Sequence, residues 1–282
     1  MFKFVLLIQL IAFLGTASAD VEVAPQIVGG NDARPGQFPY MVSIQTAGYR
    51  GSHGCGAGII NERWILSAAH CLLNDRTELY ALIVGTIRMD EDGDVYSVEQ
   101  IVRHPSYVIN VPPFYTSNWF DIGLLKTTTK IIFNEFVRPI PLGRRRITGS
   151  LPAIAAGFGA YSPNITIDSP ATEWVMSRHL QYMPATIISH NECNIRTSFF
   201  NALNPFYLIK PIIHPTSHIC TIQPASGLCF GDSGSMLIAD GEAVGVVVSG
   251  VRLCGQVDAA PDIYTRISSF TGWIDNYTNE LN

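Results

Sequence analysis

The chain of 282 residues has few charged side chains and no long hydrophobic stretch. Charged residues make up 15% of it, and 18 Lys and Arg against 23 Asp and Glu give a formal net charge of -5. Nucleic-acid binding depends on clustered positive charge, so no nucleic-acid partner is indicated. The apolar run from Phe4 to Leu14 is shorter than the roughly 18 residues of a spanning helix, and no later stretch reaches that length. We therefore expect no membrane partner either.

Cysteine is scarce as well. The chain has six cysteines, and no two of them stand in Cys-x-x-Cys spacing. That spacing is typical of zinc sites and redox motifs, so we expect no metal and no cofactor. Six cysteines allow many alternative disulfide pairings, and their spacing does not choose among them.

Residues 1–19 have the features of a secretory signal peptide. Lys3 precedes the apolar run, and small residues at 17–19 supply a cleavage site before Asp20. A secreted, extracellular protein meets an oxidising environment in which cysteines form disulfides. Export also makes the sequons at Asn164 and Asn276 usable for glycosylation. We expect the protein to be a monomer.

Short β-branched and aromatic runs recur between turn residues, which predicts an all-β barrel or sandwich fold. The runs are 40–45, 64–67, 79–84, 95–102, 153–157, 178–183, 235–238 and 243–248. Helical periodicity is convincing only at about 267–279, where it predicts a terminal helix docked on the β body. Segments 110–118 and 201–216 are expected to be long surface loops.

Three short motifs carry the residue types of acyl-transfer chemistry. Glycines flank Ser233, so the backbone can bend sharply, and the amides of Gly231 and Ser233 can point at one substrate oxygen. His70 follows a predicted strand, and imidazole is the natural base near neutral pH. Asp121 precedes an apolar run, where a buried carboxylate needs a partner such as a histidine N–H. Taken singly, each motif is better explained by a structural role: a turn for the Ser233 motif, a structural histidine for His70 and a helix or turn cap for Asp121.

In the order His, Asp, Ser, the motifs together resemble the trypsin and chymotrypsin family of serine proteases. Ile27-Val28-Gly29-Gly30 is similar to that family's mature amino terminus. Further similarity lies at 55–58, 104–107, 139–140, 157–159 and 264–267. The likeness covers residues 27–282.

The resemblance implies two antiparallel six-stranded β-barrels with a C-terminal helix and an active site between the barrels. His70 and Asp121 would come from the first barrel and Ser233 from the second, and together they would form a catalytic triad. Residues 1–19 would be the signal peptide, 20–26 an activation propeptide and 27–282 the protease domain. The implied disulfides are Cys55–Cys71, Cys193–Cys220 and Cys229–Cys254.

The same resemblance implies activation by cleavage. A cut before Ile27 would free an amino group that pairs with Asp232 and orders the site. Most relatives carry Arg or Lys before this point, and here the residue is Gln26. The activating protease is therefore not identified. Other implied partners are protein or peptide substrates and protein inhibitors.

Four residues are implied to line the substrate pocket, and they suggest different substrate specificities. Gly227 at the pocket floor is not the Asp of trypsin, and Val251 narrows the facing wall as in elastase-like members. Asp262 would add a carboxylate from the other side, as in crustacean collagenolytic members. Ser249 would begin the strand that pairs with substrate and hydrogen-bond the triad aspartate, and Gly250 replaces the usual Trp beside it. We expect chymotrypsin-like, elastase-like or broad specificity.

Some alternatives stay open. Asp262 could make the protein a trypsin-like convertase, and a non-catalytic homologue could act as a binding protein. The acidic residues Asp90, Glu91, Asp92 and Asp94 lie in a loop where the resemblance implies that some relatives bind calcium. We favour a solvated loop, since Thr86 stands where those relatives carry a glutamate. The run Arg144 to Arg146 is read as a solvated loop, with a proteolytic nicking site as the alternative.

Overall fold

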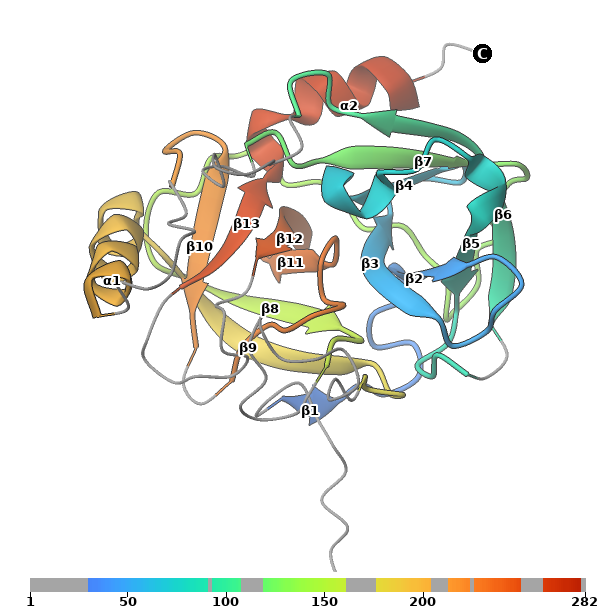
Figure 1. The fold of residues 1–282 in the computed structure, drawn as a ribbon, viewed down its shortest axis with the longest axis horizontal. Coiled ribbons are helices and arrows are strands. Elements are labelled where there is room, and N and C mark those ends of the chain that lie inside the picture. The colour runs from blue at the N-terminus through green and yellow to red at the C-terminus, as the bar shows by residue number, and fades with distance from the viewer. Residues whose placement is uncertain are drawn as a thin grey trace, which may run out of the picture.

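The fold, taken from a computed structural model, consists of two β-barrels side by side with a helix at the C-terminal end (Figure 1). The structure describes residues 30–90, 93–107, 119–160, 176–203, 213–223, 226–249 and 261–279, with the side chains of 201–203 and 249 excepted. In this described part, no helix is long and apolar enough to cross a membrane.

The first barrel is a closed ring of six antiparallel strands. Its order is β2-β3-β4-β7-β6-β5, and β5 pairs back to β2. Buried aliphatic side chains such as Val42, Ile59, Leu82 and Leu125 fill its interior. The strands are β2 Met41–Thr46, β3 His53–Ile59, β4 Trp64–Ser67, β5 Tyr80–Val84, β6 Asp94–Arg103 and β7 Gly123–Thr127.

The second barrel is also closed by six antiparallel strands, in the order β8-β9-β10-β13-β12-β11, with β11 pairing back to β8. A short strand, β1 Asn31–Asp32, adds to β9. The strands are β8 Leu151–Gly157, β9 Gln181–Ile188, β10 His218–Ile222, β11 Met236–Ala239, β12 Glu242–Ser249 and β13 Asp262–Arg266. The predicted pair of six-stranded barrels is confirmed.

One predicted strand, 178–183, is displaced, because β9 runs from Gln181 to Ile188. Pro184 stands in the middle of β9, and proline cannot donate a hydrogen bond to a sheet, so this half of the strand does not look like one in the sequence. Its side chain faces solvent, while Met183 and Ala185 on either side are buried. The alternation is regular despite the proline.

The predicted terminal helix is confirmed as α2, Thr271–Thr278, which follows a 3-10 turn at Ile267–Ser269. Ile274 is fully buried, and Tyr277 packs against Trp64 of β4 with ring centroids 6.5 Å apart. The helix follows the last strand of the second barrel but docks on the first (Figure 1). It therefore ties the two barrels together.

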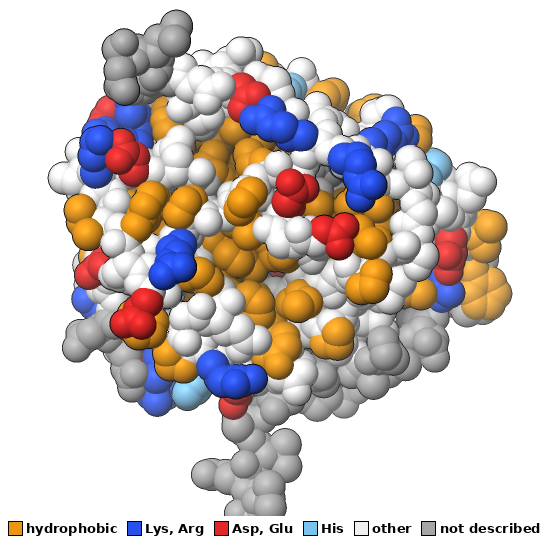
Figure 2. All heavy atoms as spheres, turned by 180° about the vertical axis from the view of Figure 1, so that it is seen from behind, with side chains coloured by type: hydrophobic (Ala, Val, Ile, Leu, Met, Phe, Trp, Pro, Cys, Tyr) orange, Lys and Arg blue, Asp and Glu red, His pale blue; other side chains and the backbone are white. Residues whose placement is uncertain are grey.

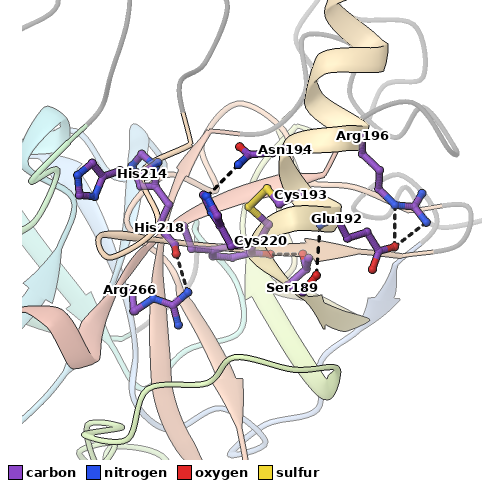
Figure 3. Close-up of a disulfide and its surroundings, with 12 residues drawn as sticks. Ser189, Glu192, Cys193, Asn194, Arg196, His214, His218, Cys220 and Arg266 are labelled. Carbon is purple, nitrogen blue, oxygen red and sulfur yellow. Dashed lines mark hydrogen bonds and ion pairs between the residues drawn. A yellow bond between two sulfur atoms is a disulfide. The ribbon is translucent and has the colours of Figure 1, made fainter.

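A second helix, α1 His190–Leu203, was not predicted, and its last three residues fall in the segment expected to be a loop. Its buried positions, Cys193, Thr197 and Phe200, include a polar residue, whereas Ile195 and Phe199 face solvent. The apolar pattern is therefore weak. The Cys193–Cys220 disulfide fastens the helix to β10 (Figure 3). The implied pairings Cys55–Cys71 and Cys193–Cys220 are confirmed.

The surface carries closely mixed charge. Figure 2 shows basic and acidic side chains next to one another on the face opposite the view of Figure 1. Some basic and acidic neighbours form exposed ion pairs, such as Arg76 with Glu78 and Arg196 with Glu192. Such pairs contribute only about 0–1 kcal/mol each, so the stability of the fold depends on its buried apolar clusters, one of which spans both barrels.

Candidate active site

His70 and Asp121 are joined by two hydrogen bonds. The Asp121 Oδ1 atom accepts from the backbone N–H of His70 at 2.9 Å, and Oδ2 lies 2.6 Å from His70 Nδ1. Asp121 is fully buried, while His70 is partly exposed. An ionised carboxylate only accepts, so Nδ1 donates, which leaves Nε2 as the acceptor nitrogen of a neutral imidazole. Burial lowers the pKa of His70, but the charge of Asp121 and its hydrogen bond outweigh this effect, so the His70 pKa is raised.

Local structure positions both residues. His70 lies on a 3-10 turn, Ala69–Leu72, directly after β4, and the Cys55–Cys71 disulfide fastens this turn to β3. Asp121 stands just before β7 and follows Phe120, whose φ of 58° is costly for a bulky side chain. The Phe120 ring stacks on His104 with centroids 5.0 Å apart and packs edge-on against Phe270. These aromatic contacts hold the strained turn that presents the carboxylate.

The Ser233 loop is anchored to both barrels. Its Ser233 carbonyl accepts from Gly56 N–H of β3 at 2.8 Å, and Gly234 N–H donates to Val247 of β12 at 2.8 Å. Gly234 has a φ of +81°, and a Cβ there would lie 2.3 Å from the Gly56 oxygen, so only glycine fits. Ser233 is partly exposed.

Two absences in this loop bear on chemistry. In the described part of the chain, the amides of Gly231 and Ser233 donate to no acceptor. No hydrogen bond between described residues joins Ser233 Oγ to His70 either. The resemblance assigns these two amides to a substrate oxygen, and they are available for it.

The side chain of Asp232 is fully buried beside Gly159. Its Oδ1 accepts from the Gly159 amide at 2.8 Å and its Oδ2 from the Cys229 amide at 2.9 Å. A Cβ on Gly159 would stand 2.3 Å from the carboxylate, so the glycine makes room for it. Burial raises the Asp232 pKa to about 6, against the two amides that lower it. Ile27, its expected partner, lies outside the described residues.

His53 is a site residue that sequence reasoning missed. Its Nε2 lies 2.9 Å from the Gly231 carbonyl and must donate to it, so Nδ1 accepts from Ser43 Oγ at 2.8 Å. Burial lowers the His53 pKa to about 4, although the bond to Gly231 acts in the opposite direction. A neutral imidazole therefore links the first barrel to the loop that carries Ser233. The glycine-rich strand β3 lacks a β-branched run and gave no signal for it.

The predicted pocket residues are described in part. Gly227 and Asp262 are both buried, and the Asp262 carboxylate accepts from the Leu228 amide at 3.3 Å, so it lies against the predicted pocket floor. Val251, with Gly250 beside it, lies outside the described residues. Ser249 ends β12, but its side chain lies outside them too.

The remaining predicted sites are also only partly described. Asn276 is exposed on α2, while Asn164 lies outside the described residues. Cys229 is disulfide-bonded, and its implied partner Cys254 lies outside them.

Charged loops are used in structural contacts. Asp90 lies within ion-pair distance of Arg88 and Arg178, at 3.6 and 3.7 Å, while Glu91 and Asp92 are outside the described part. In the basic run, the Arg144 guanidinium donates two hydrogen bonds, of 2.7 and 2.8 Å, to the Asp275 carboxylate of α2.

Several known proteins are similar to this chain. Chymotrypsin-2 of Vespa crabro is 28% identical over 254 residues, covering 88% of this chain and 98% of its own. Hypodermin-B of Hypoderma lineatum is 29% identical over 279 residues, covering 97% of each. Human heparin binding protein has a similar structure, with a TM-score of 0.69, 25% identity, and 91% of this chain and 98% of its own covered. Neuropsin, described as a serine protease of mouse brain, has a TM-score of 0.70 at 24% identity, with coverage of 88% and 98%, and shares the fold.

A family model described as Trypsin matches residues 27–274, most of the chain. The match contains the two barrels and the residues His70, Asp121 and Ser233. The chain therefore belongs to the trypsin family of serine proteases.

Proposed function

We propose that the protein is a serine endopeptidase that cuts peptide bonds through an acyl-enzyme. Ser233 Oγ attacks the substrate carbonyl carbon while His70 Nε2 takes the hydroxyl proton. The amides of Gly231 and Ser233 hold the negative oxygen. His70 then returns the proton to the leaving amine. In the second step a water that His70 deprotonates attacks the acyl ester, and His70 passes this proton to the departing Ser233 Oγ. The observation that carries this proposal is the pair of bonds by which Asp121 orients His70.

The proposal includes secretion and activation. Residues 1–19 direct export, residues 20–26 form a propeptide, and the domain 27–282 becomes active after a cut between Gln26 and Ile27. The new amino group pairs with Asp232. The raised pKa of this buried carboxyl supports the step, because a buried carboxylate gains more from a cation than an exposed one does. Glycosylation at Asn164 and Asn276, a monomeric state, an activating protease and protein inhibitors complete the proposal.

We propose chymotrypsin-like, elastase-like or broad specificity. The name of the relative Chymotrypsin-2 supports it, as does Gly227 in place of a floor aspartate. The alternative is a trypsin-like convertase, which would depend on Asp262.

A second candidate is a binding protein that no longer turns over substrate. It is supported by the similarity to a protein named for heparin binding and by the lack of a hydrogen bond from Ser233 Oγ to His70 among the described residues.

Active-site labelling separates the two candidates. The chain cut before Ile27 is treated with a fluorophosphonate, and mass spectrometry counts the label. We expect stoichiometric modification at Ser233, slow modification of the uncut chain and none in Ser233→Ala. Absence of label from the cut, folded chain would leave the binding protein as the function.

A further inference from the structure

Asp262 is a buried carboxylate with two N–H donors on one oxygen. It is 1% exposed and begins β13. Its Oδ2 accepts from the Leu228 amide and from Nε2 of Gln223, which follows β10, the strand beside β13. A buried carboxylate remains charged only where such donors replace water.

The direction of the Gln223 amide follows from the Asp262 carboxylate, which accepts from Nε2, and the other contacts of Gln223 match it. Thr221 Oγ1 donates to Gln223 Oε1 at 3.3 Å and also lies 3.2 Å from the Tyr264 hydroxyl. Because Thr221 has only one hydroxyl proton, Tyr264 must donate to Thr221. A directed chain thus runs from Tyr264 through Thr221 and Gln223 to Asp262, and it turns the amide N–H₂ toward the carboxylate.

This chain bears on which substrates the carboxylate can attract. Hydrogen bonds to the ionised form of a carboxylate favour that form, and the Gln223 amide donates one of the two such bonds to Asp262 Oδ2. The amide and the Leu228 N–H together hold Oδ2 against the floor segment that contains Gly227. A side chain without donors at position 223 would favour the ionised form of this carboxylate less and would orient it less well.

We infer that Gln223 is a specificity-determining positioning residue, which holds the Asp262 carboxylate charged and oriented to attract an amidinium or guanidinium group above Gly227. The inference rests on the proposed function and deepens it. It predicts that the protein accepts basic as well as apolar side chains at the cleavage site.

Two substitutions at Gln223 test the inference. Gln223→Met keeps the length of the side chain and removes the donor, and Gln223→Glu replaces the donor with a like charge. Calorimetry measures benzamidine binding to the cut chain and to its Ser233→Ala form. Kinetics measure kcat/KM for two peptides that differ only in Arg or Leu at the cleavage site.

We expect Gln223→Met to weaken benzamidine binding and to lower the Arg-to-Leu ratio of kcat/KM by about tenfold each, since a hydrogen bond to a charged group is lost. Gln223→Glu should lose more, because two carboxylates then meet. The kcat/KM for the Leu peptide should change by less than about twofold. A general change in packing would instead lower kcat/KM for both peptides. In an Asp262→Asn background, Gln223→Met should have no further effect.

Unchanged benzamidine binding in Gln223→Met would overturn the inference, and so would an equal loss in the Asp262→Asn background. The failure of the proposed function is distinguishable. If no peptide is cut and no fluorophosphonate reacts, the endopeptidase is ruled out, while benzamidine binding still decides the role of Gln223.

Discussion

At the scale of single residues, the Asp121–His70 pair makes the sharpest prediction. Asp121→Asn keeps the size of the side chain but presents an amide N–H₂ or carbonyl to His70, which favours the wrong tautomer. We expect kcat to fall by about four orders of magnitude, as in enzymes of this design. Peptide hydrolysis by the cut chain measures it, with the exposed Asp75→Asn as a matched control. A loss below tenfold would contradict the role given to Asp121.

Two buried titrating residues, Asp232 in the Ser233 loop and His53 in β3, predict opposite pH dependences of stability. The Asp232 pKa is raised to about 6 from 3.8, so the folded state binds the extra proton and stability falls as the pH rises between these values. The His53 pKa is lowered to about 4 from 6.5, so there the unfolded state binds the extra proton and stability rises with pH. In the uncut chain the two effects largely cancel between pH 4 and 6.

Substitution should separate them. In uncut Asp232→Asn only the histidine effect remains, so we expect the free energy of unfolding to rise by about 3 kcal/mol between pH 4 and 6, on the order of 1.4 kcal/mol per pKa unit. Urea unfolding at stepped pH measures this rise. A pH dependence equal to that of the native chain would show that Asp232 does not titrate in this range.

At the scale of elements, α1 depends on its disulfide more than on its apolar face. The helix exposes Ile195 and Phe199, at 69% and 63%, and Cys193–Cys220 fastens it to β10 (Figure 3). Replacing both cysteines by Ala should cost about 3 kcal/mol of unfolding free energy. Denaturant unfolding measures the loss, and hydrogen exchange should show faster opening of the helix. The matched control Ile195→Ala should cost under about 0.5 kcal/mol; an equal cost for both variants would refute the argument.

The sequence did contain a signal for this helix. Ser189 caps it, its Oγ accepting from the Glu192 amide at 3.2 Å, and Ser-x-x-Glu is the spacing of a capping box. Glu192 also pairs with Arg196 one turn later. Local capping thus indicated a start that the hydrophobic pattern did not. The displaced strand β9 has the opposite cause, since Pro184 interrupts a pattern that the barrel tolerates at an exposed position.

At the scale of the whole molecule, the second barrel is hydrogen-bonded to the backbone of Asp121. Thr265 of β13 donates from Oγ1 to the backbone carbonyl of Asp121 at 2.8 Å, and it is fully buried. Thr265→Val keeps the shape and leaves that carbonyl without this donor, so we expect a loss of about 1–3 kcal/mol in stability. Thermal unfolding measures it, with the exposed Thr128→Val as control. If the two variants unfold alike, the bond does not couple the barrels.

Much of this architecture could be predicted from the sequence because alternation in short runs survives the closure of a barrel. The resemblance supplied the strand count and the disulfides that short-range patterns could not choose. His53 and Gln223 could not have been found this way, since their roles depend on partners 178 and 39 residues away along the chain. Contacts between residues so far apart along the chain produce no periodic pattern in the sequence.

The docking of α2 on the first barrel has a consequence for biosynthesis. Tyr277 of α2 contacts Trp64 of β4, which leaves the ribosome much earlier than Tyr277 does. Because every strand of both barrels precedes α2 in the chain, the contact of α2 with the first barrel forms after all of the barrel strands have been made.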